Sequence, residues 1–393
     1  MPFHYEQNPR LSFDSFASLC DSAEKEKQSL ERRSLRELLH RGARFYDDHS
    51  FGHPGEGLQF NEEGLHSFCR LMRVPFALTT GIERAGLSTD LLNDVLGRNT
   101  IQQELGNHDL VTDTRTGLIV GVVSCSYVTY SNRDLLDDLD GLVKRSGKDG
   151  RPRLNFESGH MLNTKLRVRF RTELQAGVVR GRGGTADDKT IIGFQFVNSM
   201  TGDTAIRIDF YLHRLICANG IIAPVSQTEN VVFHSGREAN FLNRLDRRFH
   251  AVTRSIDNAV KQWQRLATID FNPQLLAKAG FTSDILDLCG EQRDELRKVG
   301  SDLKLPEDMP REEKRLRRET AVIDAIPKRL ATGGSARVFQ SYWRDNKTLF
   351  DFVNLFTERA KECDDLARRI EMEESAGLLA DRLFKHRQKL GSN

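Results

Sequence analysis

The sequence lacks the cysteine spacing of a zinc site or a redox dithiol. Its six cysteines stand singly along the chain: Cys20, Cys69, Cys125, Cys217, Cys289 and Cys363. Structural zinc ligation and thioredoxin-like chemistry usually need a C-x-x-C pair. Scattered single cysteines are typical of a reducing compartment. We therefore expect a cytoplasmic protein that carries no cofactor.

Long apolar runs and an excess of one charge are missing too. No stretch of about 18 apolar residues occurs, the length that a transmembrane helix needs. The first ten residues, MPFHYEQNPR, lack the basic and then apolar pattern of a signal peptide. We therefore expect no membrane partner. The chain has 58 Lys and Arg against 56 Asp and Glu residues, so any attraction to nucleic acid must come from a local patch.

Internal repeats are also missing, which argues against a solenoid. Apolar residues make up 38% and charged residues 29% of the 393 positions, a balance that favours helical layers over one large sheet core. We predict an α+β fold with a central mixed, mostly antiparallel sheet flanked by N-terminal and C-terminal helical regions. The expected parts are an N-terminal helical layer over 1–110, a central β-rich core over 111–236 and a C-terminal helical region over 237–393.

Hydrophobic periodicity gives the expected elements. The continuous apolar run over 118–127 predicts a central strand that is covered on both faces. Apolar residues at helical spacing predict helices elsewhere, over 22–44, 61–72, 88–99, 239–267, 339–357 and 361–389.

The segment 190–237 predicts a β-hairpin that is followed by a polar elbow. Ile192, Phe194 and Phe196 alternate with other residues before the turn at 200–203, and the alternation resumes at Ile206. The elbow holds four polar or reactive residues: Arg214, Cys217, Asn219 and His234. A zinc site or a thiolate–imidazole pair is possible chemistry for such a set. A structural elbow is the favoured interpretation, because Asn219 precedes a glycine as in a natural turn pair.

The strand predicted over 163–174 carries a cation at every second residue. Its charges would lie about 6.8 Å apart on one face, comparable to the phosphate spacing of an extended single strand. Gln195 would join this face if the hairpin pairs beside it. A solvated sheet face is the alternative, but we predict phosphate binding by Lys165, Arg167, Arg169, Arg171, Arg180, Arg182 and Arg207.

Acidic residues near the first strand offer a different chemistry. A two-metal nuclease needs carboxylates that converge at strand ends, and His234 could assist them. The candidates are Asp109, Asp113, Asp137, Asp138, Asp140 and Glu157. No Asp…Glu-x-Lys arrangement supports this alternative, which would require Mg²⁺.

Three stretches carry a resemblance to a known family. They are IVGVVSCSYVTYSN after Arg115, VNSMTGDTAIRIDFYLHRLICANG with His234 shortly after, and TLFDFVNLFT over 348–357. Together they resemble a phage- and plasmid-related family defined by a domain of unknown function. The matching positions are Arg207, Arg214, Cys217, Asn219, His234 and Asn354. The helical stretch over 271–334 departs from the family pattern.

The resemblance implies a role in DNA metabolism. In outline the expected sheet and flanking helices are similar to phage single-strand annealing proteins, which bind DNA by backbone contacts in oligomeric rings. We therefore predict a non-enzymatic, homo-oligomeric protein that binds single-stranded DNA and anneals or protects strands in recombination or repair. A metal-dependent nuclease or phosphodiesterase, and a factor that binds host defence or replication proteins, are the alternatives.

Overall fold

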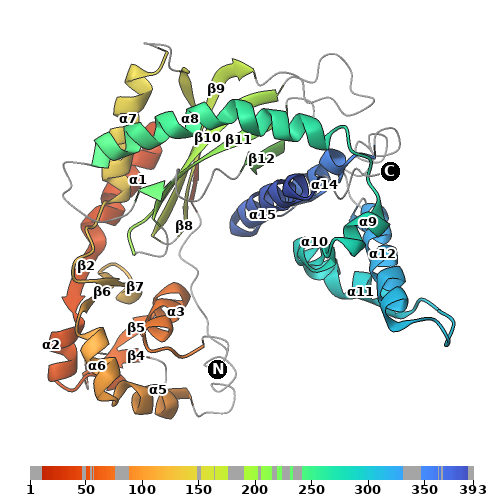
Figure 1. The fold of residues 1–393 in the computed structure, drawn as a ribbon. Helices are drawn as coiled ribbons and strands as arrows, with labels where there is room; N and C mark the ends of the chain where they lie inside the picture. The colour runs from red at the N-terminus through yellow and green to blue at the C-terminus, as the bar shows by residue number, and fades with distance from the viewer. Residues whose placement is uncertain are drawn as a thin grey trace.

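The computed structural model describes residues 11–46, 50–53, 55, 57–75, 88–147, 152–162, 164–175, 190–201, 205–214, 219–223, 231–232, 241–330, 347–361, 363 and 366–387. Two sheets, with helices at both ends of the chain, make up this part of the molecule (Figure 1). The predicted α+β class is therefore confirmed. The strands form two separate sheets rather than the single central sheet that was expected.

The larger sheet is antiparallel throughout and has the order β1-β8-β9-β10-β11-β12, with β13 also paired to β11. The predicted hairpin is confirmed: β10 and β11 pair with Phe194 opposite Phe210. The strands are β1 (Leu11–Phe13), β8 (Leu154–Leu162), β9 (Lys165–Gln175), β10 (Thr190–Ser199), β11 (Ile206–Arg214), β12 (Asn219–Ala223) and β13 (Val231–Val232).

One face of this sheet is apolar and packs against helices. Phe170, Phe194 and Phe196 lie side by side on it and are fully buried. Phe249 of the long helix α8 (Phe241–Leu266) lies 4.8 Å, ring centre to ring centre, from Phe194. Figure 1 shows α8 running across the sheet, with α1 (Phe16–Ser29) and α7 (Asn132–Arg145) at one end. The helix predicted over 239–267 is thus confirmed, and its apolar side closes the main core.

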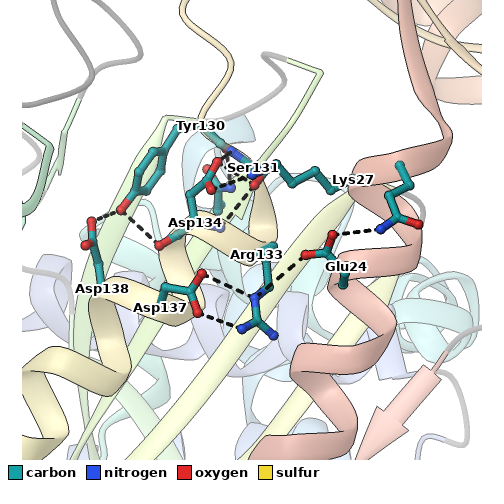
Figure 2. A network of polar contacts seen from close by, with 10 residues as sticks. Glu24, Lys27, Tyr130, Ser131, Arg133, Asp134, Asp137 and Asp138 are labelled. Carbon is teal, nitrogen blue, oxygen red and sulfur yellow. Dashed lines mark hydrogen bonds and ion pairs between the residues drawn. The ribbon is translucent and has the colours of Figure 1, made fainter.

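Polar contacts join α1 to α7 at the edge of this core (Figure 2). Ser131 caps α7 and forms a capping box with Asp134. Asp134 also forms an ion pair with Lys27 of α1, 2.7 Å from nitrogen to oxygen. Arg133 binds Asp137 on its own helix at 2.8 Å and approaches Glu24 of α1 at 3.9 Å. These pairs fix the two helices side by side along the sheet.

The smaller sheet has the order β2-β6-β7-β5-β4-β3, and only β5 and β7 run parallel. β7 is a buried inner strand, as predicted from its continuous apolar run. The strands are β2 (Leu30–Ser34), β3 (Arg44–Phe45), β4 (Ser50–Gly52), β5 (Leu58–Phe60), β6 (His108–Asp113) and β7 (Leu118–Ser124).

This sheet corrects the predicted N-terminal helical layer. The helix expected over 22–44 is broken, since α1 ends at Ser29, β2 pairs along β6, and only then does α2 (Leu35–His40) begin. Pairing with a distant strand overrides a local periodicity that suited a helix. The predicted boundary between 110 and 111 falls inside β6, so the sheet crosses it.

Helices cover one face of the smaller sheet around a cluster of phenylalanines. Phe45, Phe51, Phe60 and Phe68 pack together with ring centres 5.2–6.3 Å apart. Asn61 caps the predicted helix α3 by accepting the backbone N–H of Gly64. The helices are α3 (Glu62–Leu71), α5 (Ser88–Leu96) and α6 (Asn99–Leu105).

The C-terminal region is helical, as predicted. Beyond α8, Figure 1 places the helices of residues 273–330 away from the sheets and the last two helices beside β12. The elements are α9 (Pro273–Lys278), α10 (Thr282–Leu288), η2 (Gly290–Gln292), α11 (Arg293–Ser301), α12 (Arg311–Leu330), α14 (Leu349–Lys361) and α15 (Leu366–Lys385). Within the described ranges, no helix has the length and apolarity needed to cross a bilayer.

Candidate nucleic-acid interface

The cationic strand predicted from the sequence is β9, and its cations share one face. Arg169 lies opposite Gln195 of β10, which lies opposite Asp209 of β11. Arg167 and Arg207 flank Val197 in the next row. Residues that lie opposite one another in adjacent strands point to the same side of a sheet, so Gln195 and Arg207 join this face as expected.

Each described cation on this face has a carboxylate partner within the chain. Arg169 donates to Glu373 at 2.5 Å and to the side-chain oxygen of Gln195 at 2.9 Å. The remaining pairs are Lys165 with Glu63 at 3.0 Å, Arg167 with Glu374 at 3.9 Å, Arg171 with Glu157 at 2.5 Å, and Arg207 with Asp209 and Glu374, both at 2.6 Å. The face is therefore neutralised from inside the molecule.

Helix α15 closes this face. Its Glu373 and Glu374 pair with Arg167, Arg169 and Arg207, while Leu379 and Leu383 of the same helix are buried in the main core. Burying one leucine contributes roughly 1.5–3 kcal/mol, whereas a surface ion pair contributes about 0–1 kcal/mol. Detaching α15 from the core would therefore cost several times the free energy of breaking one surface ion pair. This corrects the expectation that β9 presents an open row of cations to phosphate.

The pKa values of two neighbouring side chains agree with a closed network. His160 of β8 lies opposite Arg167 of β9, and its pKa is lowered to about 4, chiefly by burial and also by the nearby guanidinium groups of Arg169, Arg369 and Arg167. Burial also raises the pKa of Tyr211 well above its usual value, and its hydroxyl donates to Glu157. Both side chains are therefore neutral at physiological pH.

The structure describes the other predicted positions only in part. Arg180, Arg182, Cys217 and His234 lie outside the described residues. The backbones of Arg214 and Asn219 lie opposite each other where β11 meets β12, as expected for an elbow.

Asn354 lies in α14, 5% exposed, and neither atom of its amide has a hydrogen-bond partner. A buried polar group without a partner is rare and costs roughly 1–3 kcal/mol.

The carboxylates of the nuclease alternative are dispersed. Asp109 binds Arg32, Asp113 binds Arg115, and Asp140 binds Lys144. Tyr130 donates to Asp138 (Figure 2), while Asp137 and Glu157 have the arginine partners given above. Across the ranges that the structure describes, no three His, Cys, Asp or Glu side chains are grouped so as to hold a metal ion.

A row of unpaired cations lies instead on the outer side of α8. Arg247, Arg254, Lys261 and Arg265 are all exposed, and none pairs with a carboxylate in the part of the chain that the structure describes. At 100° per residue they fall within about 40° around the helix axis, opposite the buried Phe249. At about 1.5 Å per residue the row is about 27 Å long. We call these four residues the α8 crest.

The sequence already contained the signal for this row. Positions 247, 254 and 261 repeat every seven residues, which keeps them on one side of a helix, and 265 follows four residues later. The apolar positions of the same helix predict its core side, and the cations between them predict a charged stripe on the opposite side.

The fold and this surface define an α+β protein with two sheets, a core helix that presents unpaired cations, and a closing helix that neutralises the sheet behind it. A family model described as "Domain of unknown function (DUF932)" matches residues 119–376. The chain therefore belongs to the DUF932 family. The match runs from β7 into α15, so it includes the α8 crest. No curated protein and no solved structure matches the chain.

Proposed function

We propose that the protein binds single-stranded nucleic acid by its phosphate backbone, using the α8 crest. The observation that carries this proposal is the row of Arg247, Arg254, Lys261 and Arg265, exposed and unpaired on one side of a helix whose other side is buried. Elsewhere the arginines of the sheet are matched to carboxylates, as Arg169 is to Glu373. Unpaired cations in a line are the arrangement that phosphate neutralisation needs.

The length of the crest sets the strength of binding. Four cations that neutralise four phosphates of a single strand give a slope of about −3 in a plot of log affinity against log salt. Affinity should therefore fall about 50-fold between roughly 50 mM and 200 mM salt. The exposed Asp257 lies between Arg254 and Lys261 along α8, about 40° from Lys261 around the helix axis, so its charge partly offsets that of the row.

The cellular role belongs to the same proposal. The motifs quoted above support a phage or plasmid setting, and a phosphate-binding protein in that setting would act on DNA during recombination or repair. The homo-oligomer and the cytoplasmic location expected from the sequence stay predictions. The β9 cations have no role as free phosphate ligands in this proposal, because each of them is paired with a carboxylate of the chain.

The test is a fluorescence anisotropy titration of a labelled oligodeoxynucleotide. The double variant Arg254→Glu/Lys261→Glu reverses the charge of two of the four crest residues. Both positions are exposed, where substitutions change the free energy of unfolding by only about 0.5 kcal/mol. We expect at least a tenfold loss of affinity at low salt. The matched control is Lys298→Glu with Lys304→Glu, two exposed cations in and after α11. Equal affinity of the crest variant and the control would refute the proposal.

A further inference from the structure

We propose that two copies of this chain pair edge to edge through strand β2, so that their smaller sheets join into one continuous sheet. The surface involved is separate from the α8 crest, so this inference goes beyond the proposed function and does not depend on it. It follows from an open strand edge whose sequence, LERRS, is complementary in charge to a reversed copy of itself.

Strand β2 has one side without a strand partner. It stands at the end of the strand order of the smaller sheet and, among the described strands, pairs only with β6. Three successive residues of this strand, Glu31, Arg32 and Arg33, are exposed. Figure 1 shows β2 at the outer edge of the sheet. Such an edge offers backbone N–H and C=O groups to the strand of another molecule.

The backbone of Arg32 points to this open side. Thr114 donates its backbone N–H to the carbonyl oxygen of Ser29 at 2.8 Å, which fixes the phase of the ladder between β2 and β6. In an antiparallel ladder every second residue bonds to the same neighbouring strand. Glu31 and Arg33 therefore bond to β6, and Arg32 between them turns its N–H and C=O outward. A two-fold axis through Arg32 would let the two copies of this residue exchange both bonds.

The same axis brings opposite charges together. Glu31 of each copy would lie opposite Arg33 of the other, in the non-hydrogen-bonded type of pair, where side chains approach most closely. Opposite charges directly across two strands favour pairing, and like charges oppose it. Within one copy Glu31 and Arg33 are 3.9 Å apart, and their side chains stay 58% and 45% exposed, so each has surface left for a second partner. An axis between Arg32 and Arg33 would instead set these two arginines against each other.

The charge of Arg32 does not oppose pairing at the axis. Its guanidinium group donates to Asp109 of β6 at 2.6 Å, and to the backbone carbonyl oxygens of Tyr127 at 2.9 Å and Ser124 at 3.1 Å. Each Arg32 is therefore held against its own sheet and neutralised there. The charges that remain for a partner strand are those of Glu31 and Arg33.

The geometry also sets the size of the assembly. A two-fold contact uses the same edge on both copies and closes at two, so it predicts a dimer rather than a ring. A strand of five residues buries little surface, and small interfaces are weak or transient. The dimer should therefore form and dissociate with protein concentration.

The test is analytical ultracentrifugation of the full chain over a range of concentrations. Glu31→Arg and Arg33→Glu each place like charges opposite each other at both ends of the paired strands. We expect a dimer for the unchanged protein and a dissociation constant that is about tenfold weaker, or more, for each variant alone. An equimolar mixture of the two variants should form the dimer again, because the arginines of one then meet the glutamates of the other. Lys298→Glu, an exposed charge reversal in α11, is the control and should dimerise as the unchanged protein does.

Several outcomes would overturn the inference. A monomer at every concentration would leave the β2 edge to a different partner. A dimer or larger assembly that persists in both single variants would place the contact elsewhere. A mixture that stays monomeric would show that these charges do not meet across an axis. If a single variant fails to fold, as judged by urea unfolding, the double variant Glu31→Arg/Arg33→Glu decides. It restores both cross-strand pairs, so it should dimerise as the unchanged protein does, and a monomer would contradict the proposal.

Discussion

Replacing Glu26 with glutamine should stabilise the protein at neutral and basic pH and leave its stability unchanged in acid. Glu26 lies in α1, 4% exposed, and its carboxylate accepts a hydrogen bond from Asn132 of α7 at 2.6 Å. The charged groups that influence it are Arg115 and Asp113, which form an ion pair with each other. Burial is the largest effect and raises the pKa of Glu26 from 4.5 to about 7.

The size and sign follow from that pKa. The folded state binds the proton more tightly than the unfolded state, so the stabilisation is fully present below pH 4.5 and is lost as the pH rises to about 7. A shift from 4.5 to about 7 corresponds to about 3 kcal/mol. Glutamine never ionises, and its amide oxygen can still accept from Asn132. The variant should therefore gain up to about 3 kcal/mol over the unchanged protein above pH 7.

The assay is urea unfolding of both proteins at a series of pH values from about 4 to about 8. The difference in unfolding free energy cancels the titration of all other groups that the two proteins share. It should grow between pH 4.5 and 7 and then level off. Glu24→Gln on the exposed side of the same helix is the control and should show no such growth. A pH-independent difference for Glu26→Gln would refute the reasoning.

Three further substitutions, in the closing helix α15, in the sheet beneath it and in α14, are tested by urea unfolding. Glu373→Gln should destabilise the protein by about 3–5 kcal/mol, because Arg169 would lose its buried carboxylate partner. The double variant Arg169→Met/Glu373→Leu should recover most of that loss. A double variant that is no more stable than the single one would contradict the role of this ion pair. Gly193→Ala should cost about 1–3 kcal/mol, since an added Cβ would lie 2.2 Å from the Tyr211 ring; an unchanged midpoint would mean that Tyr211 moves freely. Asn354→Leu should be neutral or stabilising by about 1 kcal/mol, because it removes an amide without partners, whereas a marked loss of stability would show that the amide is satisfied in solution.

Sequence reasoning succeeded where the pattern was local. The alternation from Ile192 to Phe196 and again from Ile206 fixed the hairpin and the face on which its apolar residues lie. Asn61 and the apolar stripe of α8 marked helices that the structure contains. These features depend on residues within a few positions of one another, so the chain carries them in readable form.

It failed where the deciding contact was distant in the chain. Arg169 and its partner Glu373 are 204 residues apart, so an alternating row of cations could not be told from an internally neutralised one. The sequence predicts helix at β2, because its pairing partner β6 lies about eighty residues further along the chain. The α8 crest is an intermediate case. Its seven-residue spacing can be read from the sequence, whereas its exposure and the absence of paired carboxylates can be seen only in the folded structure.

The most direct test of the central claim is the salt dependence of oligodeoxynucleotide binding by the unchanged protein and by Arg254→Glu/Lys261→Glu. We predict a slope of about −3 for the unchanged protein, reduced in magnitude by about 0.7 for each crest cation that is lost. A slope and an affinity that are the same in both proteins would contradict the assignment of the α8 crest as the phosphate-binding surface.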